Sequence, residues 1–339
     1  MPTSDETAWL YGTYEDALKQ YFRVYQPSLA TILTIVDKKL FEVAAVKAGL
    51  AVVPSWYPRT IEEVEALMPD LPYPILIKPR TQVHRLWTDK GTVVYSAADL
   101  VHQYEQFTVR ERTRVRDTNP LLADIHQPFL QQFVPVGDEG VLSVTGFIDQ
   151  SGKLFVTRHS TKVLQRSIPV GVGVCFETPR EAPGLSHAIR RLCFDIGYFG
   201  IFEVEFVSFN GSWAAIDFNP RLFHQLGIDI RRGMPLPLLA YLDAAGEVEP
   251  LQATTTKAQN SDENQNVTFC DSFLLAALLV KWRLTGQMCH KDSAYWHSWK
   301  KRHAAHMVDA AIDPTDPIPG YIHALSEIKA ALQNFTMVS

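Results

Sequence analysis

Polar and apolar residues alternate along two segments on either side of an Asn-Gly pair. Residues 202–209 read Phe-Glu-Val-Glu-Phe-Val-Ser-Phe, and residues 213–221 read Trp-Ala-Ala-Ile-Asp-Phe-Asn-Pro-Arg. A period of two is typical of a strand with one buried face. An Asn-Gly pair between two such runs is a strong signal for a β-hairpin. The sequence therefore predicts a hairpin that carries acidic and amide side chains on one face.

The register of this hairpin decides which polar groups meet. A three-residue loop would place Glu205 opposite Asp217 and Glu203 opposite Asn219, with Arg221 on the same face. A two-residue loop would put Glu205 and Asp217 on opposite faces. We expect the three-residue register, formed by a three-residue or a bulged loop, because it separates the polar groups from the apolar ones. The apolar face would then contain Phe202, Val204, Phe206, Ile216 and Phe218.

The polar face would gather the oxygen ligands that magnesium prefers. Mg²⁺ is usually held by a few carboxylates together with substrate phosphates and water, and Glu205, Asp217 and Asn219 provide such a set. Mn²⁺ is the alternative ion. Arg221, directly after Pro220, could pair with a phosphate through two hydrogen bonds. The alternative is a solvated polar face without a ligand, which a single carboxylate would favour and four such groups disfavour.

Two lysines stand at expected strand ends. Residues 74–78 form an apolar run that ends at Lys78, and Lys90 precedes the next expected strand. A lysine at the end of a buried strand is costly unless its ammonium meets an anion. The segment between the two lysines could close over a nucleotide, although it lacks the glycine-lysine pattern of a P-loop. For each lysine taken alone, a structural role is the alternative.

Further residues could contact a nucleotide. Residues 129–140 begin as an apolar strand and then break at a proline and a glycine. Exposed backbone at such a break could hydrogen-bond the edge of an adenine, and Glu139 could bind ribose hydroxyls. Lys162 belongs to a second cationic group with Arg158 and Arg166, for which a solvated loop is the alternative.

Composition excludes several classes of protein. The chain has 339 residues, is 46% hydrophobic and 20% charged, and carries a formal net charge of -5, so it has no general attraction for nucleic acid or anionic membranes. Its four cysteines show neither a metal-binding spacing nor a disulfide framework. The apolar run 273–280 is too short to span a bilayer, which takes about 20 residues. The N-terminus lacks the features of a signal peptide, and we expect a cytoplasmic protein.

Periodicity and turn residues predict a mixed α+β order of elements. Apolar residues at i, i+3 and i+4 predict helices, and short alternating or apolar runs predict strands. The polar stretch 252–265 has no hydrophobic period and is typical of a linker. The expected helices are 16–25, 37–48, 61–67, 97–107, 185–196, 273–282 and 321–332. The expected strands are 50–53, 74–78, 92–95, 129–134, 141–148, 154–159, 202–209 and 213–218.

These segments, in this order, resemble the ATP-grasp superfamily. The resemblance covers residues 32–243, and its most specific part is the pair of motifs Val204-Glu-Phe206 and Asp217-Phe-Asn-Pro-Arg221. It implies an α+β fold in which two subdomains hold ATP between them. Within the superfamily the chain is most similar to carboligases related to D-aspartate ligase, with a similar segment at 313–319. The glycine-rich mobile loop of many relatives is missing between the two lysines.

The resemblance also implies roles for single residues. Lys78 and Lys90 resemble the two lysines that bind nucleotide phosphates, and Glu139 resembles the acid that binds ribose. By the same comparison, Gln131, Gln132, Phe133 and Val134 lie under the adenine, Glu205 contacts both nucleotide and metal, Asp217 and Asn219 complete the metal ligands, and Arg221, Lys90 and Lys162 are the catalytic cations.

The implied activity is an ATP- and Mg²⁺-dependent ligation. A carboxylate is activated as an acyl phosphate and is then joined to an amine, so the expected partners are a small-molecule acid and a small-molecule amine. Dimers are common among similar enzymes, which makes a homodimer one expectation. Two alternatives remain: a kinase on the same scaffold, and a nucleotide-binding module without catalysis.

The resemblance divides the chain into five parts. Residues 1–30 are expected to be the remnant of a domain that usually precedes the ATP-grasp fold, because residues 2–6 resemble the end of its last strand. Residues 31–135 form the first part, with a lid subdomain at about 72–133, and residues 136–250 form the second subdomain with the metal-binding hairpin. Residues 251–268 are a linker, and residues 269–339 are a C-terminal helical extension.

Overall fold

The structure is a computed structural model. It describes residues 1–85, 90–114, 127–136, 140–166, 170–179, 184–261, 265–286, 291–313, 315–322 and 324–326.

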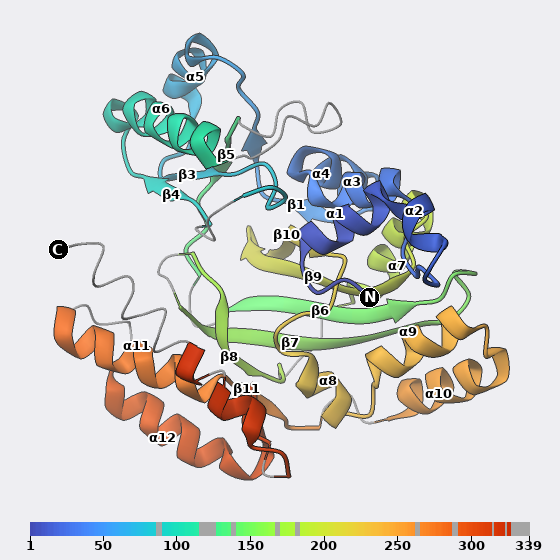
Figure 1. Cartoon of the computed structure of the whole chain (residues 1–339). Helices are drawn as coiled ribbons and strands as arrows, with labels where there is room; N and C mark the ends of the chain where they lie inside the picture. The colour runs from blue at the N-terminus through green and yellow to red at the C-terminus, as the bar shows by residue number, and fades with distance from the viewer. Residues whose placement is uncertain are drawn as a thin grey trace.

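Two β-sheets form the frame of the molecule (Figure 1). Within the described residues, the larger sheet has eight strands in the order β1-β10-β9-β6-β7-β8-β11-β12, and the smaller has four in the order β2-β5-β3-β4. The larger sheet contains β1 (Ala51–Val52), β6 (Val141–Ile148), β7 (Phe155–Gln165), β8 (Gly173–Glu177), β9 (Gly200–Phe209), β10 (Ser212–Asn219), β11 (Thr268–Cys270) and β12 (Met307–Asp309). The smaller sheet contains β2 (Ser55–Trp56), β3 (Ile75–Lys78), β4 (Thr92–Val94) and β5 (Phe129–Gln132).

Helices cover both faces of the larger sheet. α4 (Lys38–Lys47) and α7 (Ser186–Ile196) pack on one face, whereas α9 (Leu236–Ala245) and α10 (Val248–Asn260) pack on the other. The smaller sheet is covered by α5 (Ile61–Leu67) and α6 (Ala97–Arg114). The remaining helices are α1 (Asp5–Thr13), α2 (Glu15–Lys19), α3 (Leu29–Val36), α8 (Leu226–Arg231), α11 (Ser272–Thr285), α12 (Ser293–His303) and two 3₁₀ turns, Met68–Asp70 and Ala304–His306. No helix among the described residues is long and apolar enough to cross a membrane.

Local signals explain where several elements begin and turn. The Asp37 carboxylate accepts hydrogen bonds from the backbone N–H groups of Lys39 (2.9 Å) and Leu40 (3.1 Å) and so begins α4. Thr60 begins α5 in the same way. Asn210 and Gly211 have φ values of 51° and 77°, the left-handed conformations that a two-residue hairpin turn requires. The predictions of a helix at 61–67 and a strand at 141–148 are confirmed to the residue.

The N-terminal segment differs from its prediction. Residues 2–6, predicted as the end of a strand, instead contain the start of α1, where Ser4 and Thr7 form a capping box. Its third helical position is Thr7 where the common pattern has Glu or Gln, so the signal is easy to miss. α3 was also not predicted, and the helix expected at 16–25 is limited to α2.

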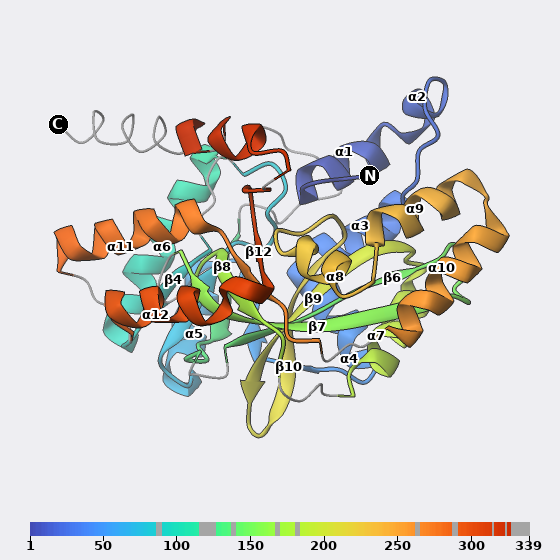
Figure 2. The same cartoon turned by 90° about the horizontal axis from the view of Figure 1, so that it is seen from below.

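The C-terminal region joins the larger sheet. The linker prediction for 252–265 is wrong over most of its length, because α10 runs to Asn260. The helical extension expected from residue 269 contains α11 and α12, but it also adds two strands to the sheet, because β11 pairs with β8 and β12 pairs with β11. The helix expected at 273–282 is confirmed as α11, while most of 321–332 lies outside the described residues. Figure 2 shows α11 and α12 next to β8 at one end of the molecule.

Candidate active site

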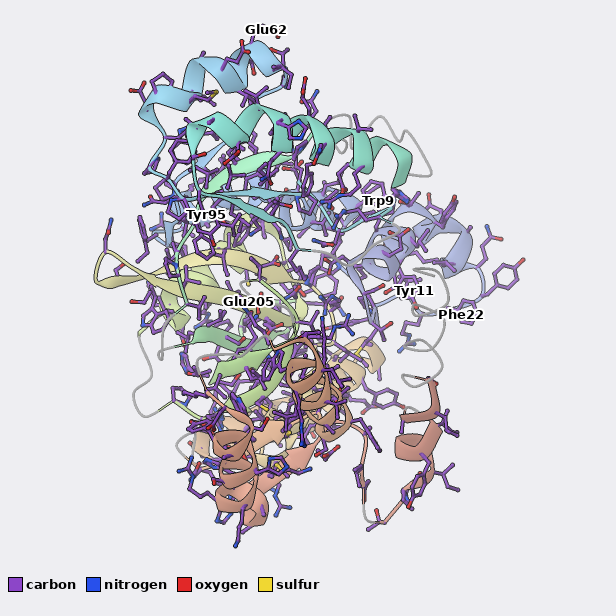
Figure 3. All side chains as sticks on the ribbon, turned by 90° about the vertical axis from the view of Figure 1, so that its left-hand side faces the viewer. Trp9, Tyr11, Phe22, Glu62, Tyr95 and Glu205 are labelled. Carbon is purple, nitrogen blue, oxygen red and sulfur yellow. The ribbon has the colours of Figure 1, made fainter. Side chains whose placement is uncertain are left out.

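A pocket lies between the two sheets and is lined by both. Figure 3 shows Glu205 deep inside the molecule, whereas Glu62 projects from the outer end of α5. β8, which was not predicted, contributes Gly173 and Phe176 to the lining. The predicted site residues found in the lining are Lys78, Lys90, Gln131, Gln132, Phe133, Val134, Lys162, Glu205, Asp217, Asn219 and Arg221. Glu139 lies outside the described residues.

The acidic hairpin pairs as predicted. Asp217 lies opposite Glu205, and Asn219 lies opposite Glu203. All four side chains line the pocket. The hairpin therefore presents three carboxylates and an amide to the space between the sheets.

The hairpin turn gives the predicted register through a bulged loop. It has two residues, because Ser212 pairs with Phe209, and a β-bulge between Ala215 and Asp217 supplies the extra residue that the register needs. The bulge also changes the face on which one apolar residue lies. Ile216, expected on the opposite face with the phenylalanines, lines the pocket instead.

Lys38 is a site residue that the sequence analysis did not single out. It is the first residue of α4, its side chain is 6% exposed, and its ammonium forms an ion pair with the Asp217 carboxylate. Burial alone would raise the pKa of Asp217, but the ammonium groups of Lys38 and Lys90 lower it to about 2. Asp217 is therefore a carboxylate at neutral pH. The sequence signal was the N-cap Asp37, which fixes where α4 starts but not what Lys38 meets.

Glu205 forms an ion pair with a second lysine, Lys162. The Lys162 ammonium lies 2.9 Å from Glu205 Oε1, so Lys162 reaches the hairpin. Burial alone would raise the pKa of Glu205, but Lys162 outweighs it and lowers the pKa below its ordinary value. Arg158, grouped with Lys162 in the sequence, lies elsewhere: its guanidinium donates to Ser261 Oγ (2.6 Å) next to α10.

Glu203, in strand β9 of the hairpin, accepts hydrogen bonds from two side-chain amides. It is 5% exposed and accepts hydrogen bonds from Asn219 Nδ2 (2.9 Å) and from the Gln225 amide. Burial and the nearby Glu205 charge raise the pKa of Glu203. Because Asn219 donates to Glu203, its oxygen faces the other way and accepts from Arg221 Nη2 (2.9 Å). Glu203 thus fixes the orientation of the Asn219 amide.

Arg221 is held from two directions. Besides Asn219, it donates from Nε to Asp5 Oδ1 at 2.7 Å. Asp5 belongs to the first turn of α1, so the N-terminal segment reaches the edge of the pocket. The carboxylate of Asp5 occupies the kind of partner position that a phosphate or a substrate carboxylate would take.

Lys78 of the smaller sheet forms no ion pair with a carboxylate among the residues that the structure describes. Lys78 Nζ donates to Gln131 Oε1 at 3.2 Å and lies 5.6 Å from the centroid of the Phe129 ring. Burial, together with the charges of Lys38 and Lys90, lowers the pKa of Lys78 to about 8. An anion in the pocket would relieve this unfavourable placement.

The segment expected under the adenine is only partly free to contact it. The backbone N–H of Gln132 donates to Pro54 O (2.9 Å), and that of Phe133 donates to Pro74 O (3.0 Å). These two donors are therefore not available to a base. Val134 follows them in the pocket lining.

Comparison with known proteins identifies the architecture. No protein-family model matches the sequence, and no curated protein matches it. The biotin carboxylase domain dimer of Hydrogenobacter thermophilus 2-oxoglutarate carboxylase, in complex with MgADP, ADP and bicarbonate, matches with a TM-score of 0.58 at 16% identity, covering 70% of this chain and 51% of that one. A biotin carboxylase–β,γ-ATP complex from Campylobacter jejuni matches with a TM-score of 0.56 at 16% identity, covering 75% and 53%. Rhizobium etli pyruvate carboxylase matches with a TM-score of 0.58 at 17% identity, covering 78% and 23%.

Biotin carboxylase domains are ATP-grasp structures. The chain has the ATP-grasp fold. It spans about half the length of the first two structures that it matches. The closer similarity to carboligases related to D-aspartate ligase stays a prediction, because the matched structures are biotin carboxylases.

The ATP-grasp pocket has a donor set that fits magnesium. Glu205 and Asp217 are opposite each other with lowered pKa values, and metal ligands must be deprotonated. Among the described residues no three His, Cys, Asp or Glu side chains form a metal cluster, so the protein would provide two carboxylates and the Asn219 amide. Mg²⁺ usually takes one or two carboxylates and completes its shell with substrate phosphates and water. The residues present therefore fit this ion.

Proposed function

We propose that the protein is an ATP- and Mg²⁺-dependent ligase that activates a carboxylate as an acyl phosphate and joins it to an amine. The observation that carries the proposal is the meeting, in one pocket, of lysines from separate parts of the fold with two ionised carboxylates on the β9–β10 hairpin. Those lysines are Lys38, Lys78, Lys90 and Lys162.

The comparisons support the use of a nucleotide. One matched structure is a complex with MgADP and ADP, and a second is a β,γ-ATP complex. In the present chain, the pocket has an apolar end next to Val134, lined by Leu76, Val141, Val207 and Ile216. An adenine would bury its faces there, while its phosphates would reach the lysines.

Phosphoryl transfer of this kind depends on position and charge more than on a nucleophilic side chain. Lys78 and Lys90 would bind the phosphates, and Arg221 would offset charge on the transferred group. Glu205, Asp217 and Asn219 would hold Mg²⁺, which would supply positive charge to offset that of the phosphates. Lys162 would keep Glu205 ionised and aligned.

The first experiment measures which products appear. Purified protein is given ATP, Mg²⁺ and pairs of carboxylic acids and amines, and the release of ADP and free phosphate is measured with the coupled product. We expect turnover only when acid and amine are both present. A phosphorylated acid or amine as the final product would identify a kinase. Nucleotide binding without turnover for every pair would favour a non-catalytic module.

The second experiment tests the hairpin. Asp217→Asn keeps the size of the side chain but removes the ionised ligand, so nearly all Mg²⁺-dependent ATP turnover should be lost. Asp195→Asn, on the outer helix α7, is the matched control and should keep the wild-type rate. Wild-type turnover in Asp217→Asn would remove the proposed site.

We also propose that the protein works as a homodimer in the cytoplasm. The Hydrogenobacter thermophilus domain is a dimer, which supports the first part. Light scattering of the purified protein at several concentrations tests it, and a monomer throughout would contradict it.

A further inference from the structure

His224 stands at the end of the pocket away from the adenine position. It follows Arg221 and lines the pocket beside Gln225. Its Nε2 lies 3.6 Å from Oδ2 of Asp271, and its ring packs edge-on against Phe269 with 5.0 Å between the centroids. The His224 side chain is 38% exposed, whereas that of Asp271 is 3% exposed. The imidazole is thus held from the protein side and stays accessible from the pocket.

Asp271 is fixed by its other contacts. Its Oδ1 accepts from the backbone N–H of Leu274 at 2.9 Å and begins α11, and its own N–H donates to Val174 O at 2.9 Å. These bonds hold Asp271 at the junction of β11 and α11, against β8. Its second carboxylate oxygen then faces His224. The C-terminal region, which sequence analysis treated as an appendage, therefore supplies a group to this end of the pocket.

The order of groups along the pocket gives this end a role. Along β9, Val207, which belongs to one apolar cluster with Val134, is followed by Glu205 opposite Asp217 and then by Glu203 opposite Asn219. Lys78 and Lys90 are close enough to Asp217 to lower its pKa. Arg221 donates to Asn219 and Gln225 donates to Glu203, so His224, between Arg221 and Gln225 in the sequence, lies at the end of the pocket opposite Val134. An acid that attacks the terminal phosphate must lie past the lysines, and its partner must approach from the same side. His224 is therefore next to the site of the second half of the reaction.

We propose that His224 is the general base of that second half-reaction, that the second substrate is an amine which arrives protonated, and that Asp271 is a positioning residue for the imidazole. The proposal rests on the proposed ligase function. Histidine is the side chain best suited to accept a proton at neutral pH, and a carboxylate on one ring nitrogen orients the other toward the reactants. Contacts of 3.6 Å in a ligand-free site commonly shorten when substrate binds.

The step balances as follows. The ammonium of the second substrate gives one proton to His224. The freed nitrogen lone pair forms the C–N bond with the acyl carbon, and the bond from that carbon to the phosphate oxygen breaks, so phosphate leaves with the electron pair. The second proton lost by nitrogen leaves with the phosphate. His224 then releases its proton to solvent.

Hydroxylamine separates the two halves of the reaction. Its nitrogen is mostly unprotonated at neutral pH, so it traps an acyl phosphate as a hydroxamate without a base. The wild-type protein, His224→Ala and the control His187→Ala would receive ATP, Mg²⁺, each of the standard amino acids as the acid, and either hydroxylamine or a second amino acid. We expect His224→Ala to form hydroxamate at close to the wild-type rate while amine coupling falls about 100- to 10,000-fold. His187→Ala, exposed on α7, should match the wild type in both assays.

Asp271→Asn isolates the charge of Asp271 from its helix cap, because Asn caps a helix about as well as Asp. We expect a smaller loss of amine coupling, on the order of tenfold, seen in kcat with little change in the KM of the amine. Hydroxamate formation should be unchanged. A loss of both reactions would show that the position is structural and would overturn the role given to Asp271.

The remaining outcomes of the coupling and hydroxamate assays each test one part of the proposal. Amine coupling at the wild-type rate in His224→Ala, or an equal fall of both reactions, overturns His224 as the base and leaves the ligase function intact. Wild-type hydroxamate formation without coupling to any amine overturns the amine as second substrate. Absence of both ADP release and hydroxamate with every acid overturns the ligase function, and this inference fails with it.

Discussion

The two walls of the pocket balance their charges differently. On the larger sheet, Glu205 and Asp217 each form an ion pair with a lysine. On the smaller sheet, Lys78 contacts the neutral Gln131 amide and the Phe129 ring. We call the side with Glu205 and Asp217 the acidic wall and the side with Lys78 the basic wall. The charges of the acidic wall are balanced within the protein. The buried charge of the basic wall is unfavourable, and a bound anion would offset it. The difference predicts that the hairpin is formed before any anion binds and that a bound anion mainly stabilises the smaller sheet.

The largest expected effect comes from breaking an ion pair on the acidic wall. Asp217→Asn leaves the buried ammonium of Lys38 without its carboxylate, which should lower the free energy of unfolding by about 3–5 kcal/mol. Denaturant unfolding at neutral pH measures it. The double variant Lys38→Met with Asp217→Asn removes both charges and should recover most of the loss. A single variant as stable as the wild type would mean that the wall is not held by this pair.

The same pair predicts a pH dependence. The pKa of Asp217 is lowered from 3.8 to about 2, so the folded protein binds the proton less readily than the unfolded chain. Its stabilising contribution is present above pH 3.8 and is lost as the pH falls toward 2.

The next effect should have the opposite sign on stability. Lys78→Met removes the buried cation of the basic wall, and a pKa lowered from 10.5 to about 8 corresponds to a gain on the order of 1–3 kcal/mol in the free energy of unfolding. The same change should weaken ATP binding at least about tenfold, since each 1.4 kcal/mol of lost attraction is a factor of ten. Unfolding curves and calorimetric titration measure the two. Lys257→Met, on the exposed side of α10, is the control, and destabilisation by Lys78→Met would contradict the contrast between the walls.

Proton uptake should accompany nucleotide binding. Above a pH of about 8, Lys78 is mostly neutral in the free protein, and a bound phosphate favours the ammonium, so binding takes up a proton. ATP affinity should therefore fall as the pH rises through 8, by up to about tenfold per unit. Without ligand, stability should increase between about 8 and 10.5, where the unfolded chain binds the proton that the folded one lacks. Calorimetry in two buffers with different ionisation enthalpies counts the proton, and Lys78→Met should show none from this source.

The smallest effect concerns the contact at the edge of the acidic wall. Asp5→Asn weakens the ion pair with Arg221. The Asp5 side chain is 12% exposed and that of Arg221 is 22% exposed. The change should lower the free energy of unfolding by about 1 kcal/mol or less. Arg221 then meets an incoming anion without competition, so the KM of the acid substrate should fall a few-fold or stay level. Steady-state kinetics measures it. A large rise in KM would mean that Asp5 orients Arg221 instead of competing for it.

The sequence predicted the acidic wall well because its signals are local. Alternation and the Asn-Gly turn are contained in about twenty consecutive residues, and they were enough to pair Glu205 with Asp217. They could not distinguish a longer turn from a bulge, because either adds one residue between the paired positions. The prediction therefore allowed either loop, and the pairing common to both is confirmed.

Contacts between distant segments were not predictable in this way. Lys38 and Asp217 are 179 positions apart, and Asp271 meets His224 from the junction of β11 and α11. Each residue taken alone looks like a helix start or a cap, and only the fold brings the pairs together. Similarly, α10 was read as a linker because its buried positions include Thr255 and Ala258, which add little to a hydrophobic pattern.

The bulge at Ile216 has a consequence for how the site tolerates change in length. The side chains of Asp217, Asn219 and Arg221 face the pocket because of that one extra residue, whereas Phe218 between them lies in the core. Deleting it would leave the turn and the ladder of hydrogen bonds possible but would rotate those groups to the far face of the sheet. The pocket face of the strand thus depends on the presence of a residue at position 216, and a substitution that keeps an apolar side chain there is tolerable where a deletion is not.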